Sequence, residues 1–442
     1  MSFGKSGLRV IAAFALLVSL FLMEMGASAA EKNPIVLRVL HYLDATSPGA
    51  HRELIEVWEA FEKANPDIKI VREDLFNEPF HQKTEIYAAT GQLPDVIYMW
   101  PGGRSTTLHT KKLVKDLAPL LGAARSEFSE AALVPQAGGY LAELPIGVTS
   151  SHVLYVNQKV LRDLGLTIPR TYEELKAMAP KLKAAGKDVI LMGAQDDWVM
   201  QSCLYSAIVG RMLGDKYVDD LIAGKAKFTD APFVNTLKFY KQLYTDGVLS
   251  AKVLQTPYNE VNALFAAGKA PFMIDGDWKV GNFLTDPTSG QALIPPDKQK
   301  DIVMTVFPAI PGEVNHGTTS VVPGVGFGMN AAIPDGSEKE KAAWKLIMWL
   351  NSVEVQRLRL ETGGAFPSRK GVTSDKLEPL AQTRAEFYGA FAGTYVLDNV
   401  LEAAVYLPIN VGLQEIGLGL ATPEQVAAKV QKAYDAWKAS QK

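Results

Sequence analysis

Apolar residues along this chain alternate between runs of strand length and stretches of helical spacing. Short apolar runs predict three buried strands, at 35–42, 68–71 and 96–99. The intervening stretches predict helices, the first opened by Ser47 and Pro48 as N-cap and first helical residue and the second covering about 79–90. Strands that alternate with helices in this way predict a parallel sheet covered by helices on both faces.

The same alternation continues to the end of the chain. Strands are predicted at 144–156, 189–192 and 270–274, and apolar helices near 198–213 and 231–245. Three helices carry start signals: Thr171 with Glu174, Ser337 with Glu340, and Thr422 with Gln425. The hydrophobic pattern therefore predicts an α/β protein over nearly its whole length.

The first thirty residues differ from the rest. Two cationic residues precede an apolar run at 10–23, and small residues follow at 26–30. This order predicts a secretory signal peptide over residues 1–30, cleaved after Ala29 or Ala30, because the run is too short for a comfortable membrane span. An uncleaved membrane anchor is the alternative.

Cys203 is the only cysteine, so no disulfide can form within the chain and stability must come from a large core. Because Cys203 lies far from the predicted cleavage region, it cannot be a lipid-modified N-terminal cysteine. We therefore expect an exported protein that is free in the periplasm and is not a lipoprotein. The apolar surroundings of Cys203 indicate a buried small hydrophobe, with a functional thiol as the alternative.

Composition narrows the function classes. The chain has 442 residues, of which 48% are hydrophobic, and its formal net charge is −3. These values suit a folded protein of two large lobes, and no basic excess points to nucleic acid or an anionic membrane surface.

Catalytic and cofactor motifs are missing from the pattern. Neither H-E-x-x-H, C-x-x-C nor a phosphate-binding G-x-x-x-x-G-K-[ST] occurs, and the glycines at 324–328 lack the spacing of a nucleotide loop. We therefore predict no cofactor, no metal and no enzymatic activity. A glycoside hydrolase needs only two carboxylates, so turnover of a glycoside would be the deciding measurement.

Five stretches, taken in order, resemble family 1 extracellular solute-binding proteins, the group that includes maltose-binding protein. They are W-E-A-F-E-K-A-N-P-D at 58–67, T-G-Q-L-P-D-V at 90–96, L-Y-V-N-Q-K with I-P-R-T-Y-E-E-L at 154–175, G-K-A-P-F-M-I-D-G-D-W at 268–278, and G-G-A-F-P-S-R at 363–369. The resemblance covers the chain from about Ile35 to Trp437.

This resemblance implies a two-lobed periplasmic binding protein fold with discontinuous lobes and a hinge of crossover segments. The implied crossovers lie at 145–155, near 323–329 and near 367–373. The implied lobes are 34–146 plus 325–370, and 150–322 plus 375–442. Ligand would bind between the lobes, which would close around it at the crossovers.

The resemblance also suggests ligand residues. Trp278 matches a position where an aromatic ring stacks on a sugar, and Asp277 would be its polar partner. Tyr406 matches a second stacking position. Thr149 lies in the first crossover, where related proteins often have a polar contact, but here it is not a carboxylate, which leaves the identity of the sugar open. Core packing is the alternative for Trp278.

Further candidates come from strand ends, since ligands of α/β sheets bind beyond the carboxyl ends of strands. Five residues follow predicted strands: Tyr42, Asp44, Trp100, Arg104 and Trp198. Arg369 borders the third crossover. Aromatic faces suit the C–H face of a sugar, and charged or amide groups suit its hydroxyls. The alternatives are core packing for Trp100, packing at a helix start for Trp198, and a solvated loop or the N-cap region for Tyr42 and Asp44.

The sequence therefore predicts a non-enzymatic receptor for a mono- to oligosaccharide. Its predicted partners are the small sugar and the permease subunits of an ABC transporter, and a monomer is expected. A receptor for a polyamine or a glycerol phosphate ester is the alternative. Acidic residues at 44, 196, 197 and 277 could bind the amino groups of a polyamine. Arg104 and Arg369 give only weak support for a phosphate-binding site.

Overall fold

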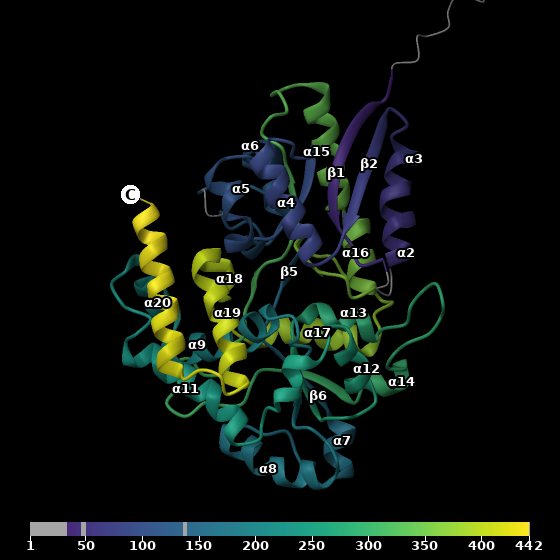
Figure 1. Ribbon diagram of the computed structural model, residues 1–442. Coiled ribbons are helices and arrows are strands. Elements are labelled where there is room, and N and C mark those ends of the chain that lie inside the picture. Colours follow the sequence, from purple (N-terminus) through teal and green to yellow (C-terminus); the bar gives the residue numbers. More distant parts are fainter. Residues whose placement is uncertain (1–32, 46–49, 136–138, 442) are drawn as a thin grey trace, which may run out of the picture.

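The computed structural model describes residues 33–45, 50–135 and 139–441. The predicted signal peptide and the helix start at Ser47 and Pro48 lie outside these residues. The described chain forms two lobes, one above the other in Figure 1, with three β-sheets. Both lobes combine a sheet with surrounding helices, so the predicted α/β class is confirmed.

The sheet of the first lobe has five strands in the order β2-β1-β3-β11-β4. Their bounds are Ile35–Tyr42 (β1), Ile68–Leu75 (β2), Val96–Met99 (β3), Gly326–Met329 (β11) and Leu144–Pro145 (β4). β1 runs parallel to β2 and β3, as predicted, but β11 is antiparallel to β3 and β4. The sheet is therefore mixed, because a segment from late in the chain returns to it.

The second lobe contains a four-stranded sheet in the order β7-β8-β6-β9. Its strands are β6 (Val153–Asn157), β7 (Ile190–Leu191), β8 (Phe272–Asp275) and β9 (Ile302–Thr305). β7 is parallel to β8, whereas β6 is antiparallel to β8 and β9. The expectation of an entirely parallel sheet is wrong here too, since β6 enters directly from the first lobe.

A third, small sheet lies where the chain passes between the lobes. Its strands are β5 (Gly147–Thr149), β10 (Val322–Pro323) and β12 (Phe366–Pro367), with β5 in the centre and both pairings antiparallel. Three connections held together by backbone hydrogen bonds can bend as a unit. We propose that this sheet is the hinge and that the lobes are divided at these segments.

Helices cover each sheet. In the first lobe they are α2 (Ala50–Arg52), a π-helix (Glu53–Glu59), α3 (Ala60–Ala64), α4 (Glu78–Thr90), α5 (Thr106–Thr110), α6 (Ala118–Leu121), α15 (Glu338–Leu350) and α16 (Val353–Glu361). Short 3₁₀ turns lie at Gly102–Ser105, Gly122–Glu127 and Glu130–Ala132.

The second lobe is richer in helix. Its α-helices are α7 (Gln158–Asp163), α8 (Tyr172–Ala184), α9 (Ser206–Leu213), α10 (Asp215–Ala223), α11 (Ala231–Thr245), α12 (Glu260–Ala266), α13 (Val280–Phe283), α14 (Pro296–Gln299), α17 (Pro379–Ala390), α18 (Leu397–Val400), α19 (Ala403–Gly417) and α20 (Pro423–Ser440). A π-helix covers Met200–Tyr205, and 3₁₀ turns cover Ala251–Gln255 and Asp277–Lys279. Among the described residues, no helix is long and apolar enough to cross a membrane.

Each lobe has its own core. Leu37, Trp58 and Phe327 belong to the core of the first lobe, whereas two clusters, one around Tyr240 and one around Phe265, fill the second. Cys203 is buried among the apolar residues of the second lobe, as predicted, and burial raises the pKa of its thiol well above the ordinary value. The hydrophobic cores of the two lobes are therefore separate.

The predicted start of α8 is confirmed in detail. Thr171 Oγ1 accepts a hydrogen bond from the Glu174 backbone N–H at 3.2 Å, and the Glu174 carboxylate accepts one from the Thr171 N–H at 3.3 Å. Thr171→Ala is expected to lower the free energy of unfolding by about 1 kcal/mol, because helix N–H groups lose their acceptor. Urea denaturation measures this loss, and Thr90→Ala, at the exposed C-terminal end of α4, should have less than half the effect.

Candidate functional site

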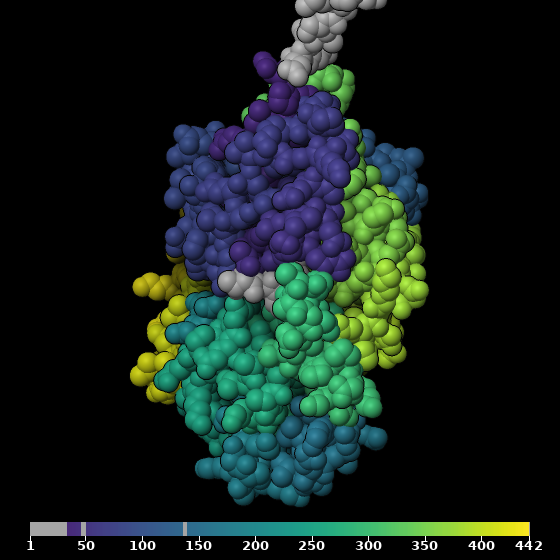
Figure 2. Space-filling model, turned by 90° about the vertical axis from the view of Figure 1, so that its right-hand side faces the viewer, coloured from purple at the N-terminus to yellow at the C-terminus, as the bar shows by residue number. Residues whose placement is uncertain are grey.

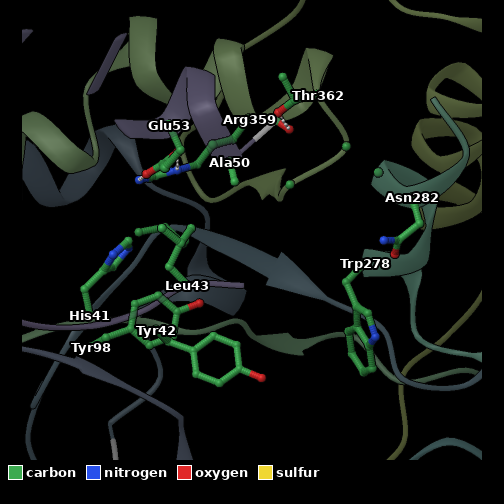
Figure 3. A pocket seen from close by; sticks show the side chains of 14 residues that line it. His41, Tyr42, Leu43, Ala50, Glu53, Tyr98, Trp278, Asn282, Arg359 and Thr362 are labelled. Atoms are coloured by element: carbon green, nitrogen blue, oxygen red, sulfur yellow. Dashed lines mark hydrogen bonds and ion pairs between the residues drawn. The ribbon is translucent and has the colours of Figure 1, made fainter. Parts of the chain in front are cut away.

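A cavity of about 200 Å³ lies between the lobes, next to the hinge. The first lobe provides His41, Tyr42, Leu43, Ala50, Glu53, Tyr98, Arg359, Thr362, Gly363 and Gly364, the second provides Trp278, Gly281 and Asn282, and Ile146 precedes the hinge strand β5. Figure 3 shows Trp278 and Asn282 approaching from the opposite side to the first-lobe residues. In the space-filling view, the first lobe lies directly above the second (Figure 2).

Aromatic rings form one wall of the cavity. Tyr42 ends β1, and its ring stacks on that of Tyr98 with centroids 5.7 Å apart. Trp100 packs edge-on against Tyr42 at 4.7 Å but lies behind it, outside the cavity lining. The Tyr42 hydroxyl donates a hydrogen bond to Asn77 Oδ1 at 3.0 Å, and burial raises its pKa. Of these rings, Tyr42 and Tyr98 are placed to touch a ligand, and Trp100 supports them.

An ion pair forms the opposite, polar wall. Arg359 donates through Nε and Nη2 to the two carboxylate oxygens of Glu53, at 3.1 and 2.5 Å, and through Nη1 to the Leu350 carbonyl at 2.6 Å. Burial by itself would raise the pKa of Glu53, but the charge and hydrogen bonds of Arg359 outweigh it and lower that pKa. No sequence pattern indicates this pair, because 306 positions separate its members and neither belongs to a motif.

Trp278 reaches the cavity from the 3₁₀ turn after β8. Its indole Nε1 donates a hydrogen bond to the Tyr258 hydroxyl at 2.6 Å, which orients the ring, and Trp198 lies 6.2 Å away between centroids. A Cβ atom on Gly276 would lie 2.2 Å from the Trp278 ring, so glycine is needed for the ring to fold back over the turn. This predicted stacking residue is therefore held in place at the cavity.

Asp277 and Thr149 have another position. Asp277 is fully buried and accepts hydrogen bonds from Thr149 Oγ1 (2.8 Å), the Ser150 backbone N–H (3.0 Å), the Tyr388 hydroxyl (2.8 Å) and Arg384 Nε (2.7 Å). Arg384 Nη2 also forms an ion pair with it at 2.6 Å. Neither Asp277 nor Thr149 lines the cavity. The structure places both in a network that joins the hinge strand β5 to the second lobe.

Arg369 also lies away from the cavity. It forms an ion pair with Glu127, donates to the Asn351 carbonyl at 2.5 Å and lies over the Phe128 ring at 4.6 Å. These contacts hold the segment after β12 on the first lobe.

The other candidates surround a second contact between the lobes, which we call the latch: the turn 102–105 of the first lobe and residues 397–401 of the second. Arg104 Nε donates to Asp398 Oδ2 at 3.1 Å, and Ser202 Oγ donates to the same oxygen at 2.9 Å. The Arg104 guanidinium also lies over the Trp198 ring at 5.7 Å. The latch is thus largely buried and charged.

The last two candidates, Tyr406 and Asp44, also lie where the lobes approach each other. Tyr406 is buried in α19 close enough to Arg104 for that charge to act on it, and burial raises its pKa to about 12. Asp44 is partly buried, and Asn259 donates to its carboxylate at 3.4 Å. The structure therefore brings Tyr42 and Trp278 to the cavity, but places Arg104, Trp198 and Tyr406 around the latch.

No group of three or more metal-ligating side chains occurs within the part of the chain that the structure describes. The aromatic rings of Tyr42, Tyr98 and Trp278 and the Glu53–Arg359 pair line the cavity. This lining can hold a small ligand that has both an apolar face and hydroxyl groups.

Comparisons with known proteins identify the family and the fold of the chain. The family described as bacterial extracellular solute-binding protein matches residues 47–357. A solved chitin oligosaccharide binding protein superposes with a TM-score of 0.79 at 23% identity, covering 92% of this chain and 100% of that chain. The maltose/maltodextrin-binding domain MalE from Bdellovibrio bacteriovorus, bound to maltotriose, gives a TM-score of 0.68 at 20% identity, covering 91% and 99%. The fold is therefore the two-lobed periplasmic binding protein fold.

Among curated proteins, the sn-glycerol-3-phosphate-binding periplasmic protein UgpB of Yersinia pestis is 26% identical over 161 residues, which are 34% of this chain and 36% of that protein. The alignments with the curated relatives span half of their length or less.

Proposed function

The chain belongs to the bacterial extracellular solute-binding protein family, and from this premise we propose that it is a periplasmic receptor that binds a carbohydrate between its lobes and delivers it to the permease of an ABC transporter. The family consists of binding receptors and not of enzymes. The single observation that supports a carbohydrate is the cavity itself, whose lining includes both the Trp278 ring and the Glu53–Arg359 pair. A sugar ring presents C–H groups to an aromatic face and hydroxyls to a carboxylate.

The solved neighbours support a carbohydrate ligand, whereas a curated relative points to a second ligand class. The two solved neighbours are described with chitin oligosaccharide and with maltotriose, whereas UgpB is described as binding glycerol 3-phosphate. A receptor for a glycerol phosphate ester is therefore the second candidate. Export through a cleaved signal peptide and a monomeric state are part of the proposal. Cys203 is buried within the second lobe, which argues against its modification by lipid.

Tryptophan fluorescence of the mature protein, residues 31–442, tests the proposal against a panel of mono-, di- and oligosaccharides. We expect a saturable change with one sugar, because that sugar would cover the Trp278 ring. Trp278→Ala is expected to weaken its binding at least tenfold, about 1.4 kcal/mol, since the stacking face is lost. Calorimetric titration gives the affinity of this variant without depending on its remaining tryptophans.

Trp437→Ala is the matched control, because Trp437 lies on α20 in ring contact with Tyr434, and it should leave affinity unchanged. If the protein binds none of the sugars but binds a polyamine or a phosphate ester, the fold assignment stands and the proposal of a carbohydrate ligand is refuted.

A further inference from the structure

We infer that the Glu53–Arg359 pair makes this cavity selective for an uncharged ligand of single-ring size, such as a monosaccharide, and selects against phosphate esters. The inference rests on the proposed function and narrows its ligand class. It assigns to Glu53 and Arg359 the role of specificity-determining residues, which no motif of the sequence indicates.

The charges around the cavity balance. Among the described lining residues, the ionised side chains are Glu53 and Arg359, which neutralise each other. His41 also lines the cavity, but its Nδ1 is hydrogen-bonded to Asp74 at 2.9 Å, and burial lowers its pKa, which favours the uncharged ring. A phosphate ester would therefore enter a site without a spare cation, and burying an uncompensated charge is costly.

The Glu53–Arg359 pair presents a ligand with hydrogen-bond acceptors more than with hydrogen-bond donors. Three of the five N–H groups of Arg359 already donate, two to Glu53 and one to the Leu350 carbonyl, and the side chain is only 5% exposed, so little of it is accessible to a ligand. Each Glu53 oxygen accepts from one Arg359 nitrogen, although a carboxylate oxygen can accept more than one hydrogen bond. The Glu53 side chain is 17% exposed. A ligand hydroxyl can donate to it, whereas a phosphate would be repelled.

The volume of the cavity suits a ligand of about one ring. Its volume of about 200 Å³ lies below the roughly 300–1,000 Å³ of sites for drug-sized ligands. At one edge the backbones of the two lobes touch, since a Cβ atom on Gly363 would lie 2.6 Å from the Cα atom of Gly281. A longer oligosaccharide would have to separate these backbones.

Calorimetric titration of the wild-type mature protein provides the first test and needs no variant. Its ligands are neutral monosaccharides, their disaccharides, the corresponding 6-phosphates and sn-glycerol 3-phosphate. We expect a neutral monosaccharide to bind at least tenfold more tightly than its 6-phosphate and than its disaccharide. A phosphate ester or a disaccharide that binds as tightly as the monosaccharide overturns the inference.

Glu53→Gln provides the second test. Removing the carboxylate leaves the Arg359 charge unbalanced, so neutral sugar should bind at least tenfold more weakly while the penalty against the 6-phosphate shrinks or reverses. Glu56→Gln, on the same π-helix but with its partner Arg52 on the surface, should change neither affinity. The double variant Glu53→Gln with Arg359→Gln is the control for misfolding, because it leaves no unpaired charge in the cavity. Its affinity for the 6-phosphate should not rise above that of the wild type.

The outcomes separate the two proposals. Preference for a sugar phosphate would overturn the selectivity but leave a carbohydrate receptor. Binding of a polyamine or of glycerol phosphate, with no response to any sugar, would overturn the carbohydrate receptor and the selectivity with it.

Discussion

Asp277→Ala is expected to lower the free energy of unfolding by about 3–5 kcal/mol, because it leaves a buried cation without its partner. Arg384 is 2% exposed, donates a hydrogen bond to Asp277 through Nε and forms an ion pair with it through Nη2. Tyr388 and Thr149 would lose their acceptor in the same variant. The loss should weaken the attachment of the hinge strand β5 to α17 of the second lobe.

Urea denaturation followed by circular dichroism measures this effect. Asp163→Ala is the control, since Asp163 forms an exposed pair with Lys159 on one turn of helix, and such pairs contribute well under about 1 kcal/mol. A second variant, Arg384→Met, removes the buried cation and should restore part of the stability when it is combined with Asp277→Ala. If Asp277→Ala unfolded at the same urea concentration as Asp163→Ala, the hinge network would have no stabilising role.

Asp398→Asn is expected to shift the unliganded protein towards an open arrangement of the lobes. In the structure Arg104 and Asp398 have side chains only 15% and 5% exposed, so the variant would leave the Arg104 charge buried and unpaired when the lobes are together. Breaking a buried pair of this kind costs about 2–5 kcal/mol, and 2 kcal/mol already changes a population ratio about 30-fold. When the lobes separate, water solvates Arg104 and the penalty disappears.

Small-angle X-ray scattering of the unliganded protein measures the shift as a larger radius of gyration. Gly103→Ala should give the same result through sterics, since its Cβ atom would lie 2.3 Å from the Leu401 carbonyl oxygen and 2.4 Å from that of Asp398. Gly389→Ala, where no atom lies within 4 Å of the added Cβ, is the control. Scattering curves of both latch variants that match the wild type would show that the latch does not hold the lobes together.

Local patterns predicted local structure well. The capping boxes at Thr171 and Thr422 form as expected, because each needs only residues within one helical turn. The rule that ligands meet the carboxyl ends of strands led to Tyr42, which does line the cavity. The same rule also selected Arg104 and Trp100, since strand ends alone do not distinguish a cavity wall from a contact between lobes.

Asp277 illustrates where sequence reasoning is insufficient. The turn G-D-W is compatible with a polar ligand residue beside a stacking ring, and Lys279 is the cation nearest to the carboxylate along this stretch. Its partners Arg384 and Tyr388 lie 107 and 111 positions downstream, on α17. Because hydrogen bonding saturates this carboxylate, the folded chain gives it a role in the hinge.

The sequence by itself determined most of the elements, the α/β class and the family, because period, capping and motif order are properties of neighbouring residues. Only the tertiary structure decided which polar groups face the cavity. Glu53 and Arg359 meet across 306 positions, and Arg104 meets Asp398 across 294. Charge balance and burial depend on such distant pairs, since the pKa and the hydrogen-bonding capacity of a group depend on the groups around it in space.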